Sequence, residues 1–290
     1  MATTTVQVPT RVLVFGMTRA DGSILVSELM PVAEACGQSA DQVRSCLRRL
    51  VDEGLFVRRG RGTDSVYEAT AEGLATLGEP MERTRLAYAQ DAAGRGWDRQ
   101  WRLVGFAIPE HNRAARDAFR QRLLALGGSA IQGGLYVCPH PWHKDVASEA
   151  ERLGVADSLT LAVTDDLEIG GVRDPRELAR HLWRLDEVAA RYQAFIDTFA
   201  EVPGELAALR ERQQRLDDTT FLTLALRMAV AFQECFSRDP LLPPELLPRP
   251  WPGRQARELS ATSRRLSRVM RQSKGLPPLF RAYDEVVDGS

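Results

Sequence analysis

The sequence predicts an α+β chain of three parts: a winged helix-turn-helix, a ferredoxin-like middle domain and a helical C-terminal domain. Three observations lead to this prediction. A helix with a basic outer face precedes a short hairpin, strands and helices then follow in the order β-α-β-β-α-β, and the remainder is helical. We expect the parts to span residues 1–79, 99–172 and 173–290, with a linker helix at 80–98.

The stretch 39–69 is the most informative part of the N-terminal region. Ser39 is a good helix N-cap, because its hydroxyl can accept from an unpaired N–H group, and apolar residues then recur at helical spacing. Gly54 suits a left-handed C-terminal cap. Residues 55–59 and 66–69 have the composition of two short strands around a glycine-containing tip. A helix followed by such a hairpin is typical of a winged helix-turn-helix that binds DNA.

Two more helices are expected before this stretch and one after it. Residues 10–18 form the first, and Ser27 caps the second, which runs to residue 35 after a turn. After the hairpin a short helix begins at residue 70. Gly78 and Pro80 then break the chain and close the domain.

The outer face of the helix and the hairpin carry the residues expected to contact DNA. The net charge of the chain is −1, yet residues 39–62 hold six arginines and only three acids. Arginine can bond guanine O6 and N7, glutamine can pair with adenine, and serine can take either role. The hairpin arginines suit the backbone or the minor groove, and a merely solvated helix face is the alternative explanation. The predicted contacts are Ser39, Gln42, Arg44, Ser45, Arg48 and Arg49 on the helix and Arg58, Arg59 and Arg61 on the hairpin.

The composition is that of an ordinary globular protein, with 44% hydrophobic and 27% charged residues. The N-terminus lacks the basic-then-apolar order of a signal peptide. The most apolar run, 221–236, contains Arg227 and Glu234 and is too short to span a bilayer. We therefore expect a cytoplasmic chain with buried, reduced thiols at Cys36, Cys46, Cys138 and Cys235, none of which forms a CxxC pair.

In the middle region, apolar segments with strand and helix character alternate between residues 101 and 164. The pattern indicates one β-α-β-β-α-β unit, the order of a ferredoxin-like fold. The expected strands are 101–108, 130–131, 135–138 and 159–164, and the expected helices are 112–126 and 142–153.

The C-terminal region has a strong helix start at Asp174, where an acidic cap is followed by Pro175 at the first helical position. Pro203 breaks the helical pattern. Further helices are expected at 217–236 and 254–273, separated by a proline-rich extended segment at 239–252 and followed by an irregular tail from residue 274.

Three segments carry a resemblance to a known family: VRSCLRRLVDEGL (43–55), WDRQWRLVGFAIPE (97–110) and RDPLLPPELLPRPWPG (238–253). On these segments the chain resembles the PaaX family of bacterial transcription repressors. The resemblance implies a dimeric repressor of an aromatic-acid catabolic operon that an aryl-CoA thioester, such as phenylacetyl-CoA, releases from operator DNA. It also implies a middle domain similar to Cas2 proteins. The alternative to the effector is a DNA-binding regulator that needs no ligand.

An aryl-CoA effector would need an apolar pocket for its ring and cations for its phosphates. Trp101, Arg102, Trp142 and Trp183 are candidates in the middle part of the chain, although tryptophans at such positions are usually core residues. A second basic row on the last helix is compatible with DNA phosphates, a CoA phosphate, an acidic partner or plain solvation. That row comprises Arg257, Arg264, Arg268 and Arg271.

No recognisable pattern indicates an enzyme, a cofactor or a metal. The chain has no P-loop, GxGxxG or GxSxG motif, and His140 and His143 lack a recognisable third ligand. Cas2-like nucleases carry a metal-binding acid at the end of the first strand. Here residues 106–108 are apolar, and Glu110 follows a proline. A metal-dependent nuclease is therefore the less favoured alternative to a DNA-binding regulator.

Overall fold

The computed structural model describes residues 9–94, 96–215, 217–270 and 279–280, and divides into two compact units. The first unit comprises the described residues of Met1–Tyr88, Tyr192–Ser237 and Pro252–Ser290. The second comprises those of Ala89–Arg191 and Arg238–Trp251. The helical C-terminal region is thus shared between the two units.

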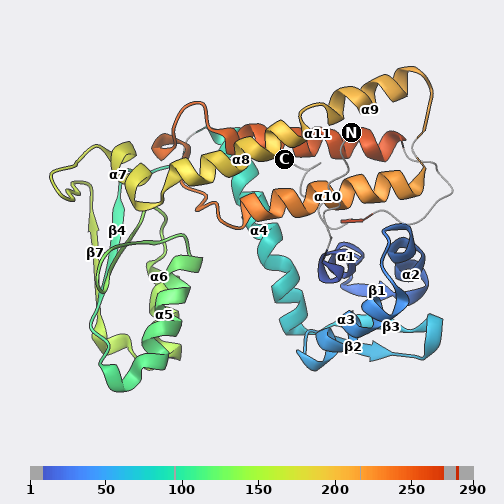
Figure 1. Cartoon of the computed structure of the whole chain (residues 1–290). Coiled ribbons are helices and arrows are strands. Elements are labelled where there is room, and N and C mark those ends of the chain that lie inside the picture. Colours follow the sequence, from blue (N-terminus) through green and yellow to red (C-terminus); the bar gives the residue numbers. More distant parts are fainter. Residues whose placement is uncertain (1–8, 95, 216, 271–278, 281–290) are drawn as a thin grey trace. The chain divides into compact units, whose positions relative to one another are not determined.

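The first unit begins with what we call the N-terminal module, residues 10–69 (Figure 1). A three-stranded antiparallel sheet of order β1-β3-β2 lies beside three helices. The elements are α1 (Thr10–Gly16), β1 (Ser23–Leu25), α2 (Val26–Ala35), α3 (Ala40–Asp52), β2 (Phe56–Arg59), a 3₁₀ turn (Gly62–Asp64) and β3 (Val66–Ala69).

The ends of α3 confirm the sequence prediction. The Ser39 Oγ accepts from the Gln42 N–H at 3.2 Å, and the Gln42 Oε1 accepts from the Ser39 N–H at 2.7 Å, which completes a capping box. At the other end Gly54 has φ +75°, and the Leu55 N–H donates to the Leu50 carbonyl at 3.0 Å. This pattern is a Schellman-type termination. Local sequence therefore sets both ends of the helix.

Three expectations for this region were wrong. Ser23 belongs to β1, which pairs with β3, and this strand was not predicted. Ser27 lies inside α2, whose N-cap residue is Leu25. Helix α4 (Ala71–Ala93) continues through Gly78 and Pro80, where a break was expected. Tertiary contacts hold its second half.

A hydrogen bond and a buried side chain show how α4 is stabilised beyond Pro80. The Arg83 Nη2 donates to the Phe236 carbonyl at 3.2 Å, and Ala87 is completely buried. Pro80 removes one hydrogen bond from the helix, but the contacts on its C-terminal side offset this loss. Helix propensity is a weak constraint when packing opposes it.

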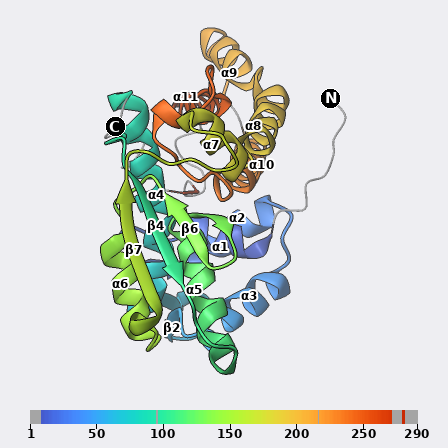
Figure 2. The same cartoon turned by 90° about the vertical axis from the view of Figure 1, so that its left-hand side faces the viewer.

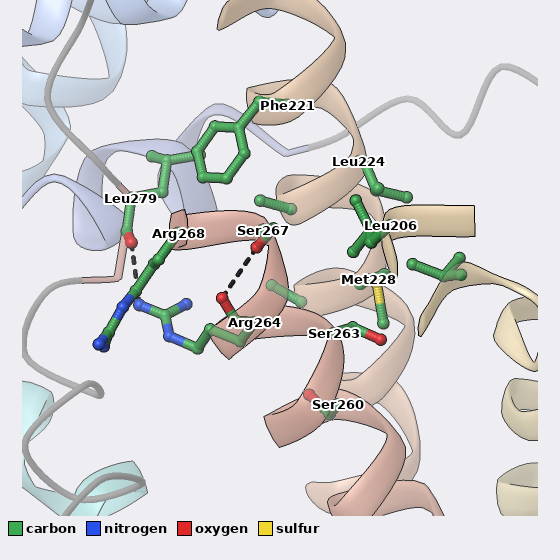
Figure 3. Close-up of a pocket in the computed structure, with 13 residues that line it drawn as sticks. Leu206, Phe221, Leu224, Met228, Ser260, Ser263, Arg264, Ser267, Arg268 and Leu279 are labelled. Atoms are coloured by element: carbon green, nitrogen blue, oxygen red, sulfur yellow. Dashed lines mark hydrogen bonds between the residues drawn. The ribbon is translucent and has the colours of Figure 1, made fainter. Parts of the chain in front are cut away.

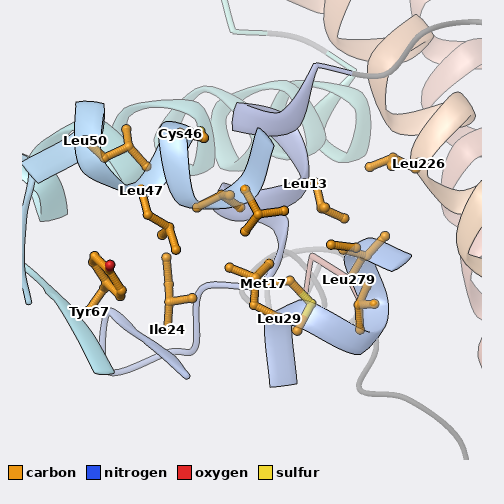
Figure 4. Close-up of a cluster of buried hydrophobic side chains, with 14 of the residues drawn as sticks. Leu13, Met17, Ile24, Leu29, Cys46, Leu47, Leu50, Tyr67, Leu226 and Leu279 are labelled. Atoms are coloured by element: carbon orange, nitrogen blue, oxygen red, sulfur yellow. The ribbon is translucent and has the colours of Figure 1, made fainter. Parts of the chain in front are cut away.

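The core of the N-terminal module includes residues that are distant in sequence (Figure 4). Leu13, Met17, Ile24, Leu29 and Leu47 are each at most 2% exposed within it. Helix α10 (Asp218–Phe236) adds Phe221, Leu222 and Leu226 to the same core, and Leu279 also belongs to it. The module therefore buries part of the C-terminal region in its own core.

The rest of the described part of the first unit is mainly helical. Helix α8 (Leu185–Phe199) contacts α10 through Phe195, whose ring lies 5.6 Å from that of Phe232. Helix α9 (Val202–Glu211) packs along α11 (Pro252–Met270). A break was predicted near Pro203, but α9 begins there. Because Pro203 lies in the first turn of that helix, its missing N–H costs no internal bond.

The second unit contains a four-stranded antiparallel sheet of order β5-β6-β4-β7. The predicted order β-α-β-β-α-β is confirmed. Helices α5 and α6 lie on one face of the sheet (Figures 1 and 2), where Val104, Phe119 and Val146 are completely buried. The elements are β4 (Trp101–Phe106), α5 (Arg113–Ala125), β5 (Ser129–Gln132), β6 (Leu135–Cys138), α6 (His143–Arg152) and β7 (Leu159–Thr164).

The opposite face of this sheet is covered by α7 (Pro175–Leu182) and the proline-rich segment 239–252. Trp101 and Val137 pack there with Leu242 and Leu246. Asp174 caps α7 as predicted, accepting from the N–H groups of the second and third helical residues. The proline-rich segment, predicted to be extended, includes a short 3₁₀ turn at Pro244–Leu246.

Among the described residues, no helix is both long enough and apolar enough to cross a membrane. The four cysteines are free thiols, and Cys46, Cys138 and Cys235 are buried. Burial raises the pKa of the Cys138 thiol to about 12 and that of the Cys36 thiol to about 11.

Candidate nucleic-acid interface

A groove of about 660 Å³ lies on the N-terminal module between α2, α3 and the β2–β3 hairpin. Three of the predicted DNA contacts line it: Arg44 and Arg48 from α3, and Arg58 from β2. Apolar side chains, among them Met30 and Leu47, form part of the same lining. The structure therefore brings together arginines from two separate elements.

Helix α3 presents Arg44 and Arg48 one turn apart on its outer surface, and both are exposed. The Arg44 side chain is 67% exposed and donates to Asp41 Oδ1 at 3.2 Å. An exposed pair of this kind is worth at most about 1 kcal/mol, so a phosphate can replace the carboxylate readily. Asp41 also lines the groove and lowers its positive charge.

The other predicted residues of α3 do not line the groove. Ser39 and Gln42 are exposed but engaged in the capping box. Arg49 lies about 100° around the helix from Arg48, as the 3.6-residue repeat requires. Burial raises the pKa of the Cys46 thiol overall, whereas the positive charges of Arg49 and Arg11 lower it. Ser45 is half-buried.

The hairpin arginines differ in their bonding. The Arg58 Nη2 and Nε both donate to the Ser65 Oγ, at 2.9 and 3.2 Å. Arg59 is paired with Glu68 at 3.2 Å, and Arg61 is exposed before the 3₁₀ turn. Arg58 is thus oriented by a neighbour toward the groove that α3 lines.

Chemically, this arrangement offers exposed guanidinium groups on a helix and on an adjacent hairpin. A guanidinium presents several N–H donors in one plane, which matches a phosphate or the O6 and N7 edge of guanine. An exposed helix with a neighbouring basic hairpin can contact the groove of a duplex and its backbone together.

The candidate ligand contacts in the second unit are packed or hydrogen-bonded within that unit. Trp101 and Trp142 are 1% and 2% exposed in its hydrophobic clusters. The Trp183 Nε1 donates to the Gly127 carbonyl at 2.9 Å, and its ring stacks on Trp101 at 6.3 Å. Arg102 donates to Asp98 and to the Pro139 carbonyl, and its hydrogen bond to Asp98 lowers the pKa of that carboxyl. These groups hold the sheet and its loops in place.

The basic row on α11 does not form one solvated stripe. Arg257 is buried at 4% exposure, Arg264 is half-buried and Arg268 is exposed, while Arg271 lies outside the described residues. Arg264 and Arg268 line a second, smaller pocket on the first unit. The other residues of that pocket have no local sequence pattern that distinguishes them.

Comparison with known proteins agrees with this architecture. Residues 94–179 match the family model described as the PaaX protein central Cas2-like domain, and residues 183–273 match the PaaX-like protein C-terminal domain. The chain belongs to the PaaX family. The predicted resemblance is thereby confirmed, and the middle of the chain is a Cas2-like domain.

Two individual proteins extend this family assignment. The chain is 26% identical over 240 residues to the protein named transcriptional repressor PaaX of Escherichia coli (strain K12), covering 82% of this chain and 72% of that protein. An uncharacterized protein from Mycobacterium tuberculosis has a solved structure that matches with a TM-score of 0.51 and 21% identity. That match covers 88% of this chain and 93% of the other, and at this identity it shows the fold alone.

The polar residues of the Cas2-like domain that first suggested a metal or catalytic role are engaged with the protein itself. The Glu110 carboxylate accepts from Arg116 at 2.5 Å. The His140 Nε2 lies 2.9 Å from the Leu241 carbonyl, and burial lowers the pKa of this imidazole. Within the described residues, no group of three or more His, Cys, Asp or Glu side chains is placed to hold a metal ion.

Proposed function

We propose that this chain is a DNA-binding transcriptional regulator of the PaaX type and that its N-terminal module is a winged helix-turn-helix. In this proposal α3 is the recognition helix and the β2–β3 hairpin is the wing. The observation that carries the proposal is the groove in which Arg44, Arg48 and Arg58 meet. The division into three domains, 1–79, 99–172 and 173–290, with a linker helix at 80–98, belongs to the same proposal.

The chemistry assigns different tasks to the two elements. Arg44 and Arg48 on α3 reach base edges or adjacent phosphates in the major groove, and the exposed Gln42 and the half-buried Ser45 are further contacts from the same helix. Arg58, Arg59 and Arg61 on the hairpin bind the backbone or the minor groove. A duplex phosphate displaces Asp41 from Arg44, since the phosphodiester also carries a negative charge and the present pair is exposed and weak.

The protein acts as a homodimer on a twofold operator, since one module buries too little surface for useful specificity. We infer repression of an aromatic-acid catabolic operon, relieved by an aryl-CoA thioester such as phenylacetyl-CoA. The similarity to the transcriptional repressor PaaX of Escherichia coli supports repression. The two arginines beside an apolar pocket on α11 support an effector with an anionic group. A role on DNA also places the protein in the cytoplasm.

Fluorescence anisotropy on DNA from the upstream region of its own gene, at two salt concentrations, tests the proposal. We expect tight, salt-sensitive binding that phenylacetyl-CoA releases and that free CoA and phenylacetate do not. Arg48→Ala should weaken binding about tenfold or more, by loss of about 1–3 kcal/mol. Arg265→Ala on α11, exposed and outside the groove, is the matched control and should leave affinity unchanged.

The outcomes separate the parts of the proposal. Binding that the thioester leaves intact keeps the regulator and removes the effector. Arg48→Ala with unchanged affinity removes α3 from the interface. Metal-dependent cleavage of the DNA that Glu110→Ala abolishes would favour a Cas2-like nuclease instead.

A further inference from the structure

The pocket on the first unit is lined by α9, α10 and α11 and has two unlike sides (Figure 3). One side is apolar, with Leu206 from α9 and Phe221 and Met228 from α10. The other side is polar and comes from α11, with serines and the guanidinium groups of Arg264 and Arg268. No acidic residue is among the described lining residues. The pocket is therefore apolar on one side and positively charged on the other.

One polar group in this pocket lacks a hydrogen-bond partner. Ser263 is 2% exposed, and its Oγ has no partner within the residues that the structure describes. An unsatisfied buried hydroxyl costs about 1–3 kcal/mol. By contrast, the Ser267 Oγ, one turn further along, donates to the Arg264 carbonyl at 2.9 Å (Figure 3). Ser263 thus has a donor and an acceptor that an incoming polar group would satisfy.

The guanidinium of Arg264 bonds neutral acceptors. Its Nη2 donates to the Leu279 carbonyl at 3.1 Å (Figure 3) and to the Phe280 carbonyl at 2.6 Å. Hydrogen bonds from a guanidinium to an anion are stronger than those to a neutral carbonyl. An anionic ligand in this pocket would therefore compete for Arg264 with the chain segment 279–280.

That segment is also a contact of the N-terminal module. Leu279 is 3% exposed and belongs to the core that contains Leu13 and Met17 (Figure 4). The Phe280 N–H donates to the Gly16 carbonyl at 2.5 Å. Its ring lies against Gly16 so closely that a Cβ there would be 2.9 Å from the Phe280 Cε1. Residues 279 and 280 thus connect the pocket to α1.

The pocket is too small to admit a ligand without a movement of its walls. Its volume is about 70 Å³, well below the roughly 300 Å³ at the lower end of usual ligand pockets. A ring or acyl chain must therefore move a lining residue to enter. Most of the walls are helical side chains, whereas Leu279 lies outside any helix. Leu279 is therefore the described lining residue that such a ligand can displace without moving a helix.

We propose that this pocket is a regulatory site for a small molecule with an apolar body and an anionic group. The apolar body lies against Leu206, Phe221 and Met228, the anion bonds Arg264 and Arg268, and a polar atom reaches Ser263. Occupancy weakens the contacts of residues 279–280 with α1. This shifts the equilibrium between conformations of the N-terminal module. The regulatory consequence rests on the proposed function, since it presumes that this module binds DNA.

A calorimetric titration of the full chain without DNA tests the site independently of that function. The probes are phenylacetate, phenylacetyl-CoA and free CoA, which separate a simple carboxylate from a thioester with its phosphates. Arg268→Gln should weaken binding of the active probe tenfold or more, and Ser263→Val threefold or more. Arg265→Gln, one residue from Arg264 but exposed and outside the pocket, is the matched control and should change it less than twofold.

Two results would overturn the site: no heat with any probe at millimolar concentration, or wild-type affinity in both pocket variants. Neither result depends on whether the chain binds DNA. Conversely, a chain that binds the probe through Arg268 but never binds DNA keeps the site and removes the proposed function.

The coupling is tested by Gly16→Ala, with Gly78→Ala in α4 as the matched control because a Cβ at Gly78 meets no atom within 4 Å. Gly16→Ala displaces Phe280, so it should imitate the ligand and lower DNA affinity at least fivefold while probe binding persists. Arg264→Gln, which removes the two carbonyl bonds, should lower DNA affinity in the same direction. Wild-type DNA affinity in both variants, with folding confirmed by circular dichroism, would overturn the coupling.

Discussion

Helices α3 and α11 both carry arginines at helical spacing, yet the structure places them in different surroundings. On α3, Arg44 and Arg48 are exposed and line an open groove. On α11, Arg257 is 4% exposed, whereas Arg268 is exposed eleven residues later. Spacing defines a face of a helix, but the elements that pack on the helix decide whether that face meets solvent, a pocket or the core. The two rows therefore have different surroundings despite similar sequence patterns.

The largest expected effect separates the two rows by DNA affinity. Arg44→Gln with Arg48→Gln should cost about 2–6 kcal/mol of binding free energy, or roughly thirtyfold or more in affinity, and should reduce the salt dependence. Arg265→Gln with Arg268→Gln removes the same charge from α11 and should change the affinity of ligand-free protein less than threefold. Anisotropy titrations at two salt concentrations measure both. Equal losses would show that net charge, and not the groove, controls binding.

The next effect concerns stability and lies within α11. Arg257→Ala should destabilise the protein by about 2–4 kcal/mol, because a buried long side chain leaves a cavity and loses its packed stem. Arg268→Ala, at the exposed end of the same row, should stay within about 0.5 kcal/mol. Urea unfolding followed by circular dichroism measures the difference. Equal midpoints for the two variants would contradict the burial gradient along α11.

A smaller effect is expected at the start of α3. Ser39→Ala removes the hydroxyl that caps Gln42 N–H and should cost about 1 kcal/mol of stability. Ser45→Ala, inside the same helix, makes no capping bond and should be neutral or slightly stabilising. Thermal melts of the two variants compare them. If Ser39→Ala lowers DNA affinity with no loss of stability, Ser39 contacts DNA directly and the cap is secondary.

The smallest effect compares two exposed ion pairs. Asp41→Asn frees Arg44 and removes an acid from the groove, so DNA affinity should rise about two- to threefold, in keeping with a pair worth below about 1 kcal/mol. Glu258→Gln removes the partner of Arg254 on α11 and should leave DNA affinity unchanged. A decrease with Asp41→Asn would mean that Asp41 positions Arg44 for binding.

Much of the fold could be predicted because its signals are local. Ser39 and Gly54 bound α3, Asp174 starts α7, and the βαββαβ order of the middle region follows from alternating strand and helix patterns. The wrong expectations arose where distant residues decide the outcome. Ser23 extends only because β3 pairs with it, and α4 passes Pro80 because Arg83 and its neighbours are held by other helices.

In the candidate sites, too, some residues have a local sequence signal, whereas others are brought together by packing alone. Arginines on α3 and the hairpin were recognisable from sequence, whereas which of them line one groove depends on how the hairpin packs beside the helix. Trp101 and Trp142 are candidate ligand contacts by sequence, whereas in the structure both are core residues of the Cas2-like domain. Ser263 and Met228 carry no signal in the sequence, since a serine and a methionine on amphipathic helices are commonplace.

The family, the order of the elements in the middle region and the ends of the best-capped helices could be predicted from the sequence, because hydrogen bonds between near neighbours and apolar periodicity act over a few residues. That Phe221, Leu226 and Leu279 complete the core of the N-terminal module, and that Arg257 is buried, became evident from the packing alone. These outcomes follow from burial of apolar surface between segments some 200 residues apart. The hydrophobic effect is non-directional, so no short pattern specifies which partner a given apolar face will find.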